Sequence, residues 1–425
     1  MVNISKIQTP SEWSTATLGG VAKDMLSGGT PSTKNTAYWK GTIPWITSKW
    51  LNDNLYLRSG EKFISQDAIE NSASKIVPSG NLIFATRVGV GKVAVNDIDL
   101  AINQDLAGIV IDKQQTMPEF LAYQLRTGPI QQFVEQNKRG ATIKGITKSC
   151  LSEIALLLPP LPEQRRIAAV LSLVQRVIEQ QERLIALTTE LKKALMHKLF
   201  TEGTRGEPQK QTEIGPIPES WEVVELNTIT RIERGKFGHR PRNEPRFYGG
   251  DIPFIQTGDV SNCDGHIREY NQTLNEDGLA ISRMFPAGTI LITIAANIGY
   301  TGILCFDSAC PDSLIAITPN DDVEAEFLNY YLTTQQPVMD RLAPRGTQKN
   351  INIQFLKPWP IPLPGKKEQL EIAAILERVA TKHREHAATK DTLSDLFRTL
   401  LHQLMTAEIR VNDLDLEEFG LDTEK

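Results

Sequence analysis

The stretch TRVGVGKVAV, residues 86–95, spaces glycines and a lysine much as a phosphate-binding loop does. In such a loop a glycine stands five positions before the last glycine, and a serine or threonine that binds Mg²⁺ follows the lysine. Here Thr86 and Val93 occupy these two positions. The stretch therefore lacks the residues that would hold a nucleotide and its metal ion.

Motifs for other catalytic chemistries are incomplete in a similar way. Pro311 and Asp312 could begin a nuclease motif, but no Glu-x-Lys follows them, and no NPPY-like methyltransferase tetrapeptide occurs. The sequence contains no CxxC pair, HExxH or GxSxG. His383 and His386, one helical turn apart in a charged stretch, are interpreted as solvated side chains. We therefore predict that the chain holds no metal, binds no cofactor and performs no chemistry itself.

The bulk composition is that of an ordinary folded protein of two to three domains, with 425 residues and 40% hydrophobic residues. No run approaches eighteen apolar residues and the N-terminus lacks a signal pattern, so we expect a cytoplasmic protein without a membrane span. The four cysteines are expected to be free thiols of a reducing compartment. The net charge of −5 offers no general attraction for polyanions, so contacts with one must come from local clusters.

The elements that carry these loops occur twice along the chain. EQRRIAAVL at 163–171 aligns without gaps with EQLEIAAIL at 368–376, and the match continues to HKLFT at 197–201 and HQLMT at 402–406. Upstream, EFLAYQL matches EFLNYYL, and Trp13 matches Trp221. The chain is thus two copies of one unit, each a globular part followed by a helix. An old duplication kept for stability alone remains an alternative, but the copies differ most in polar loops, which favours two binding surfaces.

The globular parts predict mixed α/β domains within an α+β fold. β-rich runs such as NLIFAT and TILITI alternate with short helical stretches such as PEFLAYQLRT. We predict globular domains at 1–159 and 219–364, long helices at 160–201 and 365–406, a linker at 202–218 and an acidic tail at 407–425.

The first long helix has no Gly or Pro from Glu163 to Phe200, and at 1.5 Å per residue it would be roughly 57 Å long. A helix of that length needs a partner helix, and both helices have apolar ends and polar centres, as an antiparallel coiled coil would. Two separate surface helices remain the alternative. A 4–3 alternation assigns these residues to the helix pair: Val170, Val174, Val177, Leu184, Leu191, Leu195, Ile375, Val379, Leu393, Leu396 and Leu400. A second stripe is assigned to contact with another protein: Ile167, Leu171, Ile178, Ile185, Ile372 and Leu376.

LPPLPEQRRIAAVL, KALMHKLFTEGTRGEP, IGPIPESWEVVEL and LLHQLMTAEIRV together carry a family resemblance. The chain resembles the specificity subunit of a Type I restriction–modification enzyme. The resemblance implies two target-recognition domains, each reading one half of a split site in double-stranded DNA. It implies that the helices separate these domains and dock two methyltransferase subunits, and that restriction subunits join the complex. S-adenosylmethionine, ATP and Mg are then expected only on the partner subunits.

A DNA surface should combine phosphate-binding cations with polar loops that reach base edges. The loop at 234–246 is the strongest candidate, although a solvated loop is the alternative. The loops NKRGATIK at 137–144 and APRGTQKN at 343–350 come next. The predicted DNA-binding residues are Lys49, Arg87, Lys138, Arg139, Lys144, Arg234, Lys236, Arg240, Arg242, Arg246, Arg345, Gln348 and Lys349.

Two other classes compete with this interpretation. A stand-alone DNA-binding or architectural protein would have no exposed apolar stripe on its helices, and a single-chain restriction–methylation enzyme would need the catalytic motifs that are missing. If the helices set the distance between the domains, half-sites about ten base pairs apart leave an unread gap of about six or seven base pairs.

Overall fold

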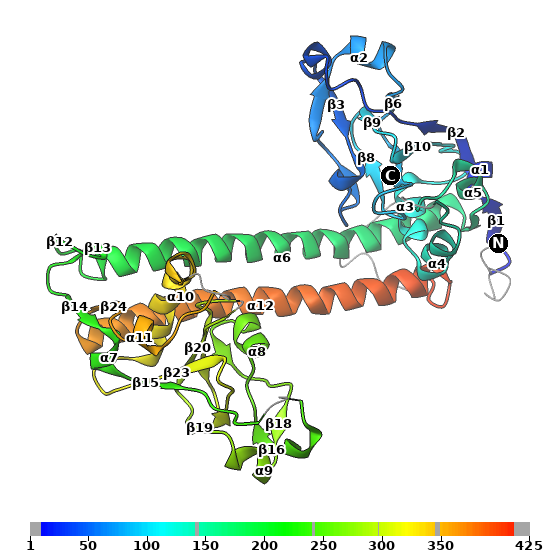
Figure 1. The fold of residues 1–425 in the computed structure, drawn as a ribbon. Coiled ribbons are helices and arrows are strands. Elements are labelled where there is room, and N and C mark those ends of the chain that lie inside the picture. Colours follow the sequence, from blue (N-terminus) through cyan, green and yellow to red (C-terminus); the bar gives the residue numbers. More distant parts are fainter. Residues whose placement is uncertain (1–9, 141–143, 240–242, 296, 345–348, 412–425) are drawn as a thin grey trace. The chain divides into compact units, whose positions relative to one another are not determined.

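The computed structural model describes residues 10–140, 144–239, 243–295, 297–344 and 349–411. The chain divides into two compact units, residues 1–183 with 387–425 and residues 184–386. Two long helices, α6 (Leu161–Glu202) and α12 (Lys366–Met405), each contribute residues to both units (Figure 1). No helix in the described part of the chain has a stretch long and apolar enough to span a bilayer.

Unit 1 contains a five-stranded sheet in the order β2-β10-β7-β8-β4, a four-stranded sheet in the order β5-β3-β9-β6, and the pair β1-β11. The strands are β1 (Ser14–Thr17), β2 (Ala22–Ser27), β3 (Ile43–Ile46), β4 (Tyr56–Leu57), β5 (Lys62–Ile64), β6 (Lys75–Val77), β7 (Asn81–Ala85), β8 (Val93–Asn96), β9 (Leu100–Ile102), β10 (Leu106–Ile111) and β11 (Ala155–Leu158). The helices before α6 are α1 (Leu18–Val21), η2 (Thr36–Trp39), η3 (Ser48–Trp50), α2 (Gln66–Glu70), α3 (Pro118–Leu125), α4 (Gly128–Gln136) and α5 (Lys148–Ser152).

Unit 2 repeats the five-stranded sheet, in the order β15-β23-β20-β21-β17, together with the pair β14-β24. Its strands are β12 (Gln209–Thr212), β13 (Gly215–Pro218), β14 (Glu222–Glu225), β15 (Thr230–Arg234), β16 (Tyr248–Pro253), β17 (His266–Ile267), β18 (Thr273–Leu274), β19 (Met284–Phe285), β20 (Ile290–Thr293), β21 (Thr301–Leu304), β22 (Ser308–Ala309), β23 (Leu314–Pro319) and β24 (Pro360–Leu363). Its helices before α12 are α7 (Leu226–Ile229), η4 (Pro245–Phe247), α8 (Thr257–Asn262), α9 (Glu276–Ala280), α10 (Ala325–Leu342) and α11 (Ile353–Leu356).

The two five-stranded sheets have the same topology, down to a parallel edge pair: β4 with β8 in unit 1 and β17 with β21 in unit 2. The runs NLIFAT and TILITI form the matching strands β7 and β20, in which every residue is buried. The copies diverge in the outer strands, which form a four-stranded sheet in unit 1 but separate two-stranded pairs in unit 2. The predicted pair of similar mixed α/β domains is therefore confirmed.

Each unit buries the start of one long helix against the end of the other. In unit 1, Ile167 and Leu171 of α6 share a core with Leu401 of α12. In unit 2, Phe200 of α6 shares a core with Ile372 of α12. Burying one such side chain contributes about 1.5–3 kcal/mol relative to leaving it exposed. Because start packs with end in both units, the helices pair antiparallel, as predicted.

The structure corrects the assignment of the apolar stripes on these helices. Four residues predicted to face another protein are at most 1% exposed within this chain: Ile167, Leu171, Ile372 and Leu376. Ile178 is also buried, and Ile185 is partly buried. Each helix packs against its own globular domain as well as against the other helix, so this stripe is used internally. Among the described residues of this stripe, the four that are at most 1% exposed therefore offer no surface to a second protein.

The predicted helix-pair residues fall into two groups. The buried or partly buried ones are Val170, Val174, Val177, Leu195, Ile375, Val379, Leu393 and Leu400. Leu184, Leu191 and Leu396 are instead 37%, 49% and 46% exposed. These three side chains are therefore not buried between the helices as the prediction expects.

The predicted linker at 202–218 is a structured segment, since β12 and β13 form an antiparallel hairpin within it. At the other end, the first residues of the predicted tail pack on unit 1. Val411 is 1% exposed, and Arg410 pairs with Glu163 at 2.9 Å. Residues 412–425 lie outside the described residues.

The repeated junction places a buried glutamate at the start of each long helix. The Glu163 carboxylate accepts hydrogen bonds from Trp13 Nε1 at 3.1 Å and from Arg410 Nε at 2.9 Å. In unit 2, Glu368 accepts from Trp221 Nε1 at 3.2 Å and pairs with the Arg205 guanidinium at 3.4 Å. A carboxylate near a helix N-terminus is also favoured by the helix dipole. The repeated tryptophan and glutamate thus join each domain to its helix.

The glutamine that follows each glutamate completes the junction. Gln164 Oε1 accepts from the Met117 N–H at 3.0 Å, just before α3, and its Nε2 donates to the Pro159 carbonyl at 2.9 Å. Gln369 makes the same two kinds of contact in unit 2, with the N–H of Glu324 and the carbonyl of Pro364. Both side chains are 1% exposed, so each fixes the helix start to the domain core.

Candidate nucleic-acid interface

Three cations surround a pocket of about 500 Å³ at one end of the five-stranded sheet of unit 1. Arg87 follows β7, Arg139 follows α4, and Lys148 begins α5. The other polar residues lining the pocket are Ser27, Thr86, Gln104 and Thr147. Among the described residues that line it, none is acidic. The pocket therefore has the charge and the hydrogen-bonding groups to receive phosphate or a base edge.

Backbone contacts bring these cations together. The loop after α4 closes through paired Arg139 and Gly145 backbones, with N–O distances of 2.8 and 2.9 Å. The next residue, Ile146, donates its N–H to the Thr86 carbonyl at 2.8 Å, which places the loop beside Arg87. A Cβ on Gly145 would lie 2.6 Å from the Thr86 carbonyl oxygen, so only glycine permits this approach.

The structure unites some predicted residues of the first half and separates others. Arg87 and Arg139 line the same pocket, and Lys144 is exposed directly before Gly145. Lys138 instead forms an ion pair with Glu135, and its side chain is only 19% exposed. Lys49 lines a different groove, beside α6. Lys138 and Lys49 therefore do not line the pocket around Arg87.

The sequence interpretation missed Lys148. It stands at the first position of α5, where Thr147 caps the helix by accepting from the Cys150 N–H at 3.2 Å. A threonine before a short helical run is a recognisable N-cap signal, so the position of Lys148 at a helix start was available from the sequence. That this helix start faces Arg87 depends on the sheet topology.

The second unit has the same backbone framework. Ala295 pairs with Asn350, and the Ile351 N–H donates to the Ile294 carbonyl at 3.0 Å, as Ile146 does to Thr86 in unit 1. Four predicted residues on the corresponding loops lie outside the described residues: Arg240, Arg242, Arg345 and Gln348.

The described cations of the second half are mostly engaged. Arg234 Nε donates to the Asp312 carbonyl at 2.7 Å, and Arg246 pairs with Asp277 at 3.2 Å. Lys349 pairs with Asp340 at 2.8 Å. The Lys236 residue is exposed, and its backbone carbonyl accepts a hydrogen bond from Ser282 Oγ.

Aromatic packing anchors the start of the loop at 234–246. Phe237 is 3% exposed, and its ring lies 6.0 Å from that of Phe247 and 5.3 Å from that of Phe254. The neighbouring Gly235 is buried, and a Cβ there would lie 2.2 Å from the Pro311 carbonyl oxygen. The loop therefore leaves a fixed base instead of being solvated along its whole length.

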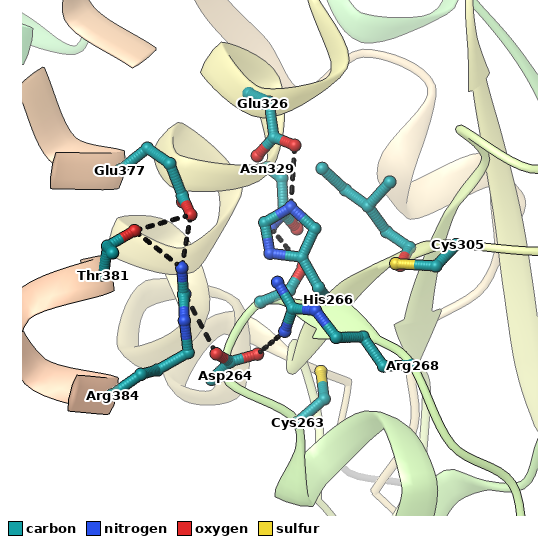
Figure 2. A network of polar contacts seen from close by, with 12 residues as sticks. Cys263, Asp264, His266, Arg268, Cys305, Glu326, Asn329, Glu377, Thr381 and Arg384 are labelled. Carbon is teal, nitrogen blue, oxygen red and sulfur yellow. Dashed lines mark hydrogen bonds and ion pairs between the residues drawn. The ribbon is translucent and has the colours of Figure 1, made fainter. Parts of the chain in front are cut away.

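A network of ion pairs joins β17, α10 and α12 in unit 2 (Figure 2). Arg384 contacts Asp264 at 3.0 Å and Glu377 at 2.6 Å, and Asp264 also contacts Arg268 at 2.8 Å. Burial raises the pKa of the Asp264 carboxyl, but its arginine partners outweigh burial and lower the pKa below its ordinary value. The pKa of Glu377 is lowered in the same way: burial opposes the shift, and Arg384 is the main partner that produces it.

One group among the described residues has the composition of a metal site. His266, Glu326 and Glu377 place ligand atoms within 4.8 Å of one another. They already have partners: His266 Nε2 contacts Glu326 Oε1 at 2.7 Å, and Glu377 accepts from Tyr330 and Arg384. His383, the other histidine considered as a ligand, contacts Thr188 Oγ1 at 3.2 Å through its Nδ1.

Comparison with known proteins agrees with this architecture. A family model described as Type I restriction modification DNA specificity domain matches residues 10–189 and 218–393. The type I restriction enzyme MjaIX specificity subunit of Methanocaldococcus jannaschii is 30% identical over 60% of this chain and 59% of its own length. The MjaVIII specificity subunit of the same organism is 24% identical over 96% of both chains.

Solved structures share the fold. The S subunit of the type I restriction–modification system of M. genitalium superposes with a TM-score of 0.61 at 17% identity, covering 95% of this chain and 99% of that one. A chain from a study of complex assembly and conformational transition of the type I R-M system gives a TM-score of 0.57 at 24% identity, covering 95% and 100%.

The two copies of one domain, each joined to a long helix, fall within the two regions that match this DNA specificity domain. This chain is a member of the type I restriction–modification DNA specificity family, and it carries two DNA specificity domains.

Proposed function

We propose that this chain recognises a bipartite site in double-stranded DNA, each domain contacting one half-site, with an unread gap between them. The observation that carries the proposal is the repeated framework with different loops. Both five-stranded sheets have the same order, yet the outer strands and the cation-bearing loops differ. A shared framework with divergent loops suits two related surfaces that recognise different sequences.

Methylation mapping after a domain exchange tests this proposal. Residues 219–364 are replaced by the same region of a relative, and the methylated motif is mapped in a host that contains the altered gene. One half of the motif should change and the other half should stay the same. A change in both halves would contradict independent recognition by the two domains.

The chain is the DNA-recognition component of a larger enzyme and carries out neither methyl transfer nor cleavage itself. Its partners are two methyltransferase subunits and restriction subunits, which bind S-adenosylmethionine, ATP and Mg, and the complex acts in the cytoplasm. The incomplete motifs at residues 86–95 and 311–312 support this division of labour. Methyl transfer by the purified chain alone would contradict it.

Exposed leucines on α6 are the surface proposed for a methyltransferase subunit. Leu184, Leu187 and Leu191 are 37%, 60% and 49% exposed, and their spacing places them on one face of the helix. Clustered exposed apolar side chains commonly mark contact with another protein. A stand-alone DNA-binding protein would have no use for this stripe, so its presence argues against that alternative.

A further inference from the structure

A second groove in unit 1 is separate from the pocket around Arg87. It has a volume of about 670 Å³ and lies between residues 49–59 and the first half of α6. Four cations line it: Lys49, Arg58, Arg176 and Arg183. Glu179 is the acidic residue among the described residues that line it. The groove therefore carries an excess of positive charge.

Most of these cations are available to a ligand. Lys49, Arg176 and Arg183 are exposed, and within the described ranges they form no ion pair. Arg58 shares its charge with Asp97 at 3.2 Å, but its side chain remains 67% exposed.

A buried arginine fixes one wall of the groove. Arg126 donates to the backbone carbonyls of Asp53 and Asn54 and to that of Val93 on β8, at 2.7 to 2.9 Å. Burial lowers the pKa of Arg126, which nevertheless stays a cation because guanidinium loses its proton only at very high pH. Arg126 holds residues 53–54 in place and adds positive charge beneath the groove.

The fold does not require the two helix arginines. With the repeat offset of 205, Arg176 and Arg183 correspond to Thr381 and Ala388. In the second copy, the helix arginine Arg384 instead forms ion pairs within the chain, with Asp264 and Glu377 (Figure 2). The free arginines are thus specific to the first copy, which indicates a ligand of that copy.

We propose that this groove binds phosphates of the DNA backbone in the gap beside the half-site recognised by the first domain. The proposal rests on the proposed function. Arg176 and Arg183 lie seven residues apart, or about 10.5 Å along one helix face, which matches about three base-pair steps of 3.4 Å. Such contacts fix the position of the DNA without selecting its sequence.

Neutral hydrogen-bond donors line the groove beside the cations. Asn52, Gln175 and Gln180 line the groove together with the cations, and amides commonly contact phosphate and sugar oxygens. Both arginines also lie within the DNA specificity domain match at residues 10–189. An acidic segment of a partner subunit is the competing occupant, and the experiment separates the two.

The test compares DNA binding by the full chain, co-expressed with its methyltransferase subunits, across a range of salt concentrations. The variants are Arg176→Gln with Arg183→Gln, and a control, Arg398→Gln, whose arginine is an exposed cation of α12 in the same unit. The probe is a duplex containing the mapped motif, either unmodified or with single methylphosphonates in the gap. Unchanged thermal unfolding confirms that each variant is folded.

The double variant should lower the slope of log affinity against log salt by about 1.8, or about 0.9 for each lost contact. A methylphosphonate that weakens wild type should have little further effect on this variant, and the methylated motif should not change. An unchanged slope would overturn the inference. Loss of the methyltransferase subunits with unchanged DNA binding would assign the groove to an acidic protein segment and also overturn it. If wild type itself fails to bind DNA, the proposed function is wrong.

Discussion

At the scale of single residues, the glutamate at the start of each long helix explains why one junction occurs twice. A carboxylate as buried as Glu163 is costly unless it is paired and hydrogen-bonded. Its partners, Trp13 and Arg410, come from opposite ends of the sequence, so one side chain joins the first strand region, α6 and the segment after α12 within unit 1. The junction therefore occurs twice because each domain needs this buried glutamate to connect it to its long helix.

Glu163→Gln should destabilise unit 1 by about 1.5–3 kcal/mol, because a hydrogen bond to a charged group is worth about that much. Glutamine can still accept from Trp13, but it leaves Arg410 without its buried partner. Urea unfolding of the full chain measures the effect. Glu190→Gln, an exposed position on the same helix, should change stability by less than about 0.5 kcal/mol. Equal stability of the two variants would contradict the role given to this ion pair.

The arginine network of unit 2 should make its stability depend on acid. The ordinary pKa values of Asp264 and Glu377 are 3.8 and 4.5, and both are lowered in the fold. Just below these values the unfolded chain therefore binds more protons than the folded chain. The contribution of the two carboxylates to the free energy of unfolding is present above the ordinary pKa values, and it is lost as the pH falls through the pKa values of the folded state. The substitution Arg384→Gln should lower the free energy of unfolding by about 1–2 kcal/mol at pH 7.

The difference in stability between wild type and Arg384→Gln should begin to shrink as the pH falls below about 4 and should disappear as the pH passes through the lowered pKa values of wild type, because the carboxyls are then protonated in both proteins. Arg378→Gln, an exposed arginine on the same helix, serves as the control and should follow wild type at every pH. A difference that stays constant from pH 7 to pH 3 would show that packing, not charge, makes the contribution of Arg384.

Local sequence predicts which loops carry cations but not which charges remain free. Arg87 and Arg139 line one pocket, yet Lys349 is paired with Asp340, nine residues away across a loop. That pairing depends on where α10 ends relative to the loop, which no spacing rule supplies. Lys138 is different, because its partner Glu135 stands at the helical spacing of three and could have been recognised.

At the scale of elements, the sequence predicts two long helices and their antiparallel pairing, but it does not decide which apolar stripe faces inward. Leu171, Ile178 and Ile185 follow a seven-residue spacing as regular as that of Leu184 and Leu191. The choice is made by the globular domain, whose core cluster includes Leu171. The spacing of apolar residues along a helix does not show which stripe packs against the globular domain.

Replacing Leu184, Leu187 and Leu191 with Ser should abolish co-purification of the methyltransferase subunits. Each lost apolar contact removes about 1.5–3 kcal/mol of burial from the complex. The chain itself should stay folded, because these side chains are exposed within it. Leu370→Ser, at an exposed leucine of α12 that is 52% exposed, is the matched control and should retain the subunits. Retention by the triple variant would place the interface elsewhere.

At the scale of the whole molecule, α6 and α12 each continue from one compact unit into the other. The division falls between Arg183 and Leu184 on α6 and between His386 and Ala387 on α12. Every core cluster described above lies within one unit. Residues inserted at these two points therefore lengthen both helices without removing a contact from either core.

Four residues inserted at both points should lengthen the unread gap in the DNA site by one or two base pairs. Four residues add about 6 Å to a helix, and DNA rises about 3.4 Å per base pair, which limits the change to about two. The half-sites should stay the same, because no recognition loop is altered. Methylation mapping of the host measures both quantities.

The same four residues inserted into the turn between β12 and β13 are the control, since that hairpin lies outside both long helices. This variant should methylate the wild-type site with the wild-type gap. Insertion into α6 alone should be less active than the paired insertion, because it shifts one helix against the other by about 6 Å in at least one unit. An active enzyme with paired insertions and an unchanged gap would mean that the helices do not set the distance between half-sites.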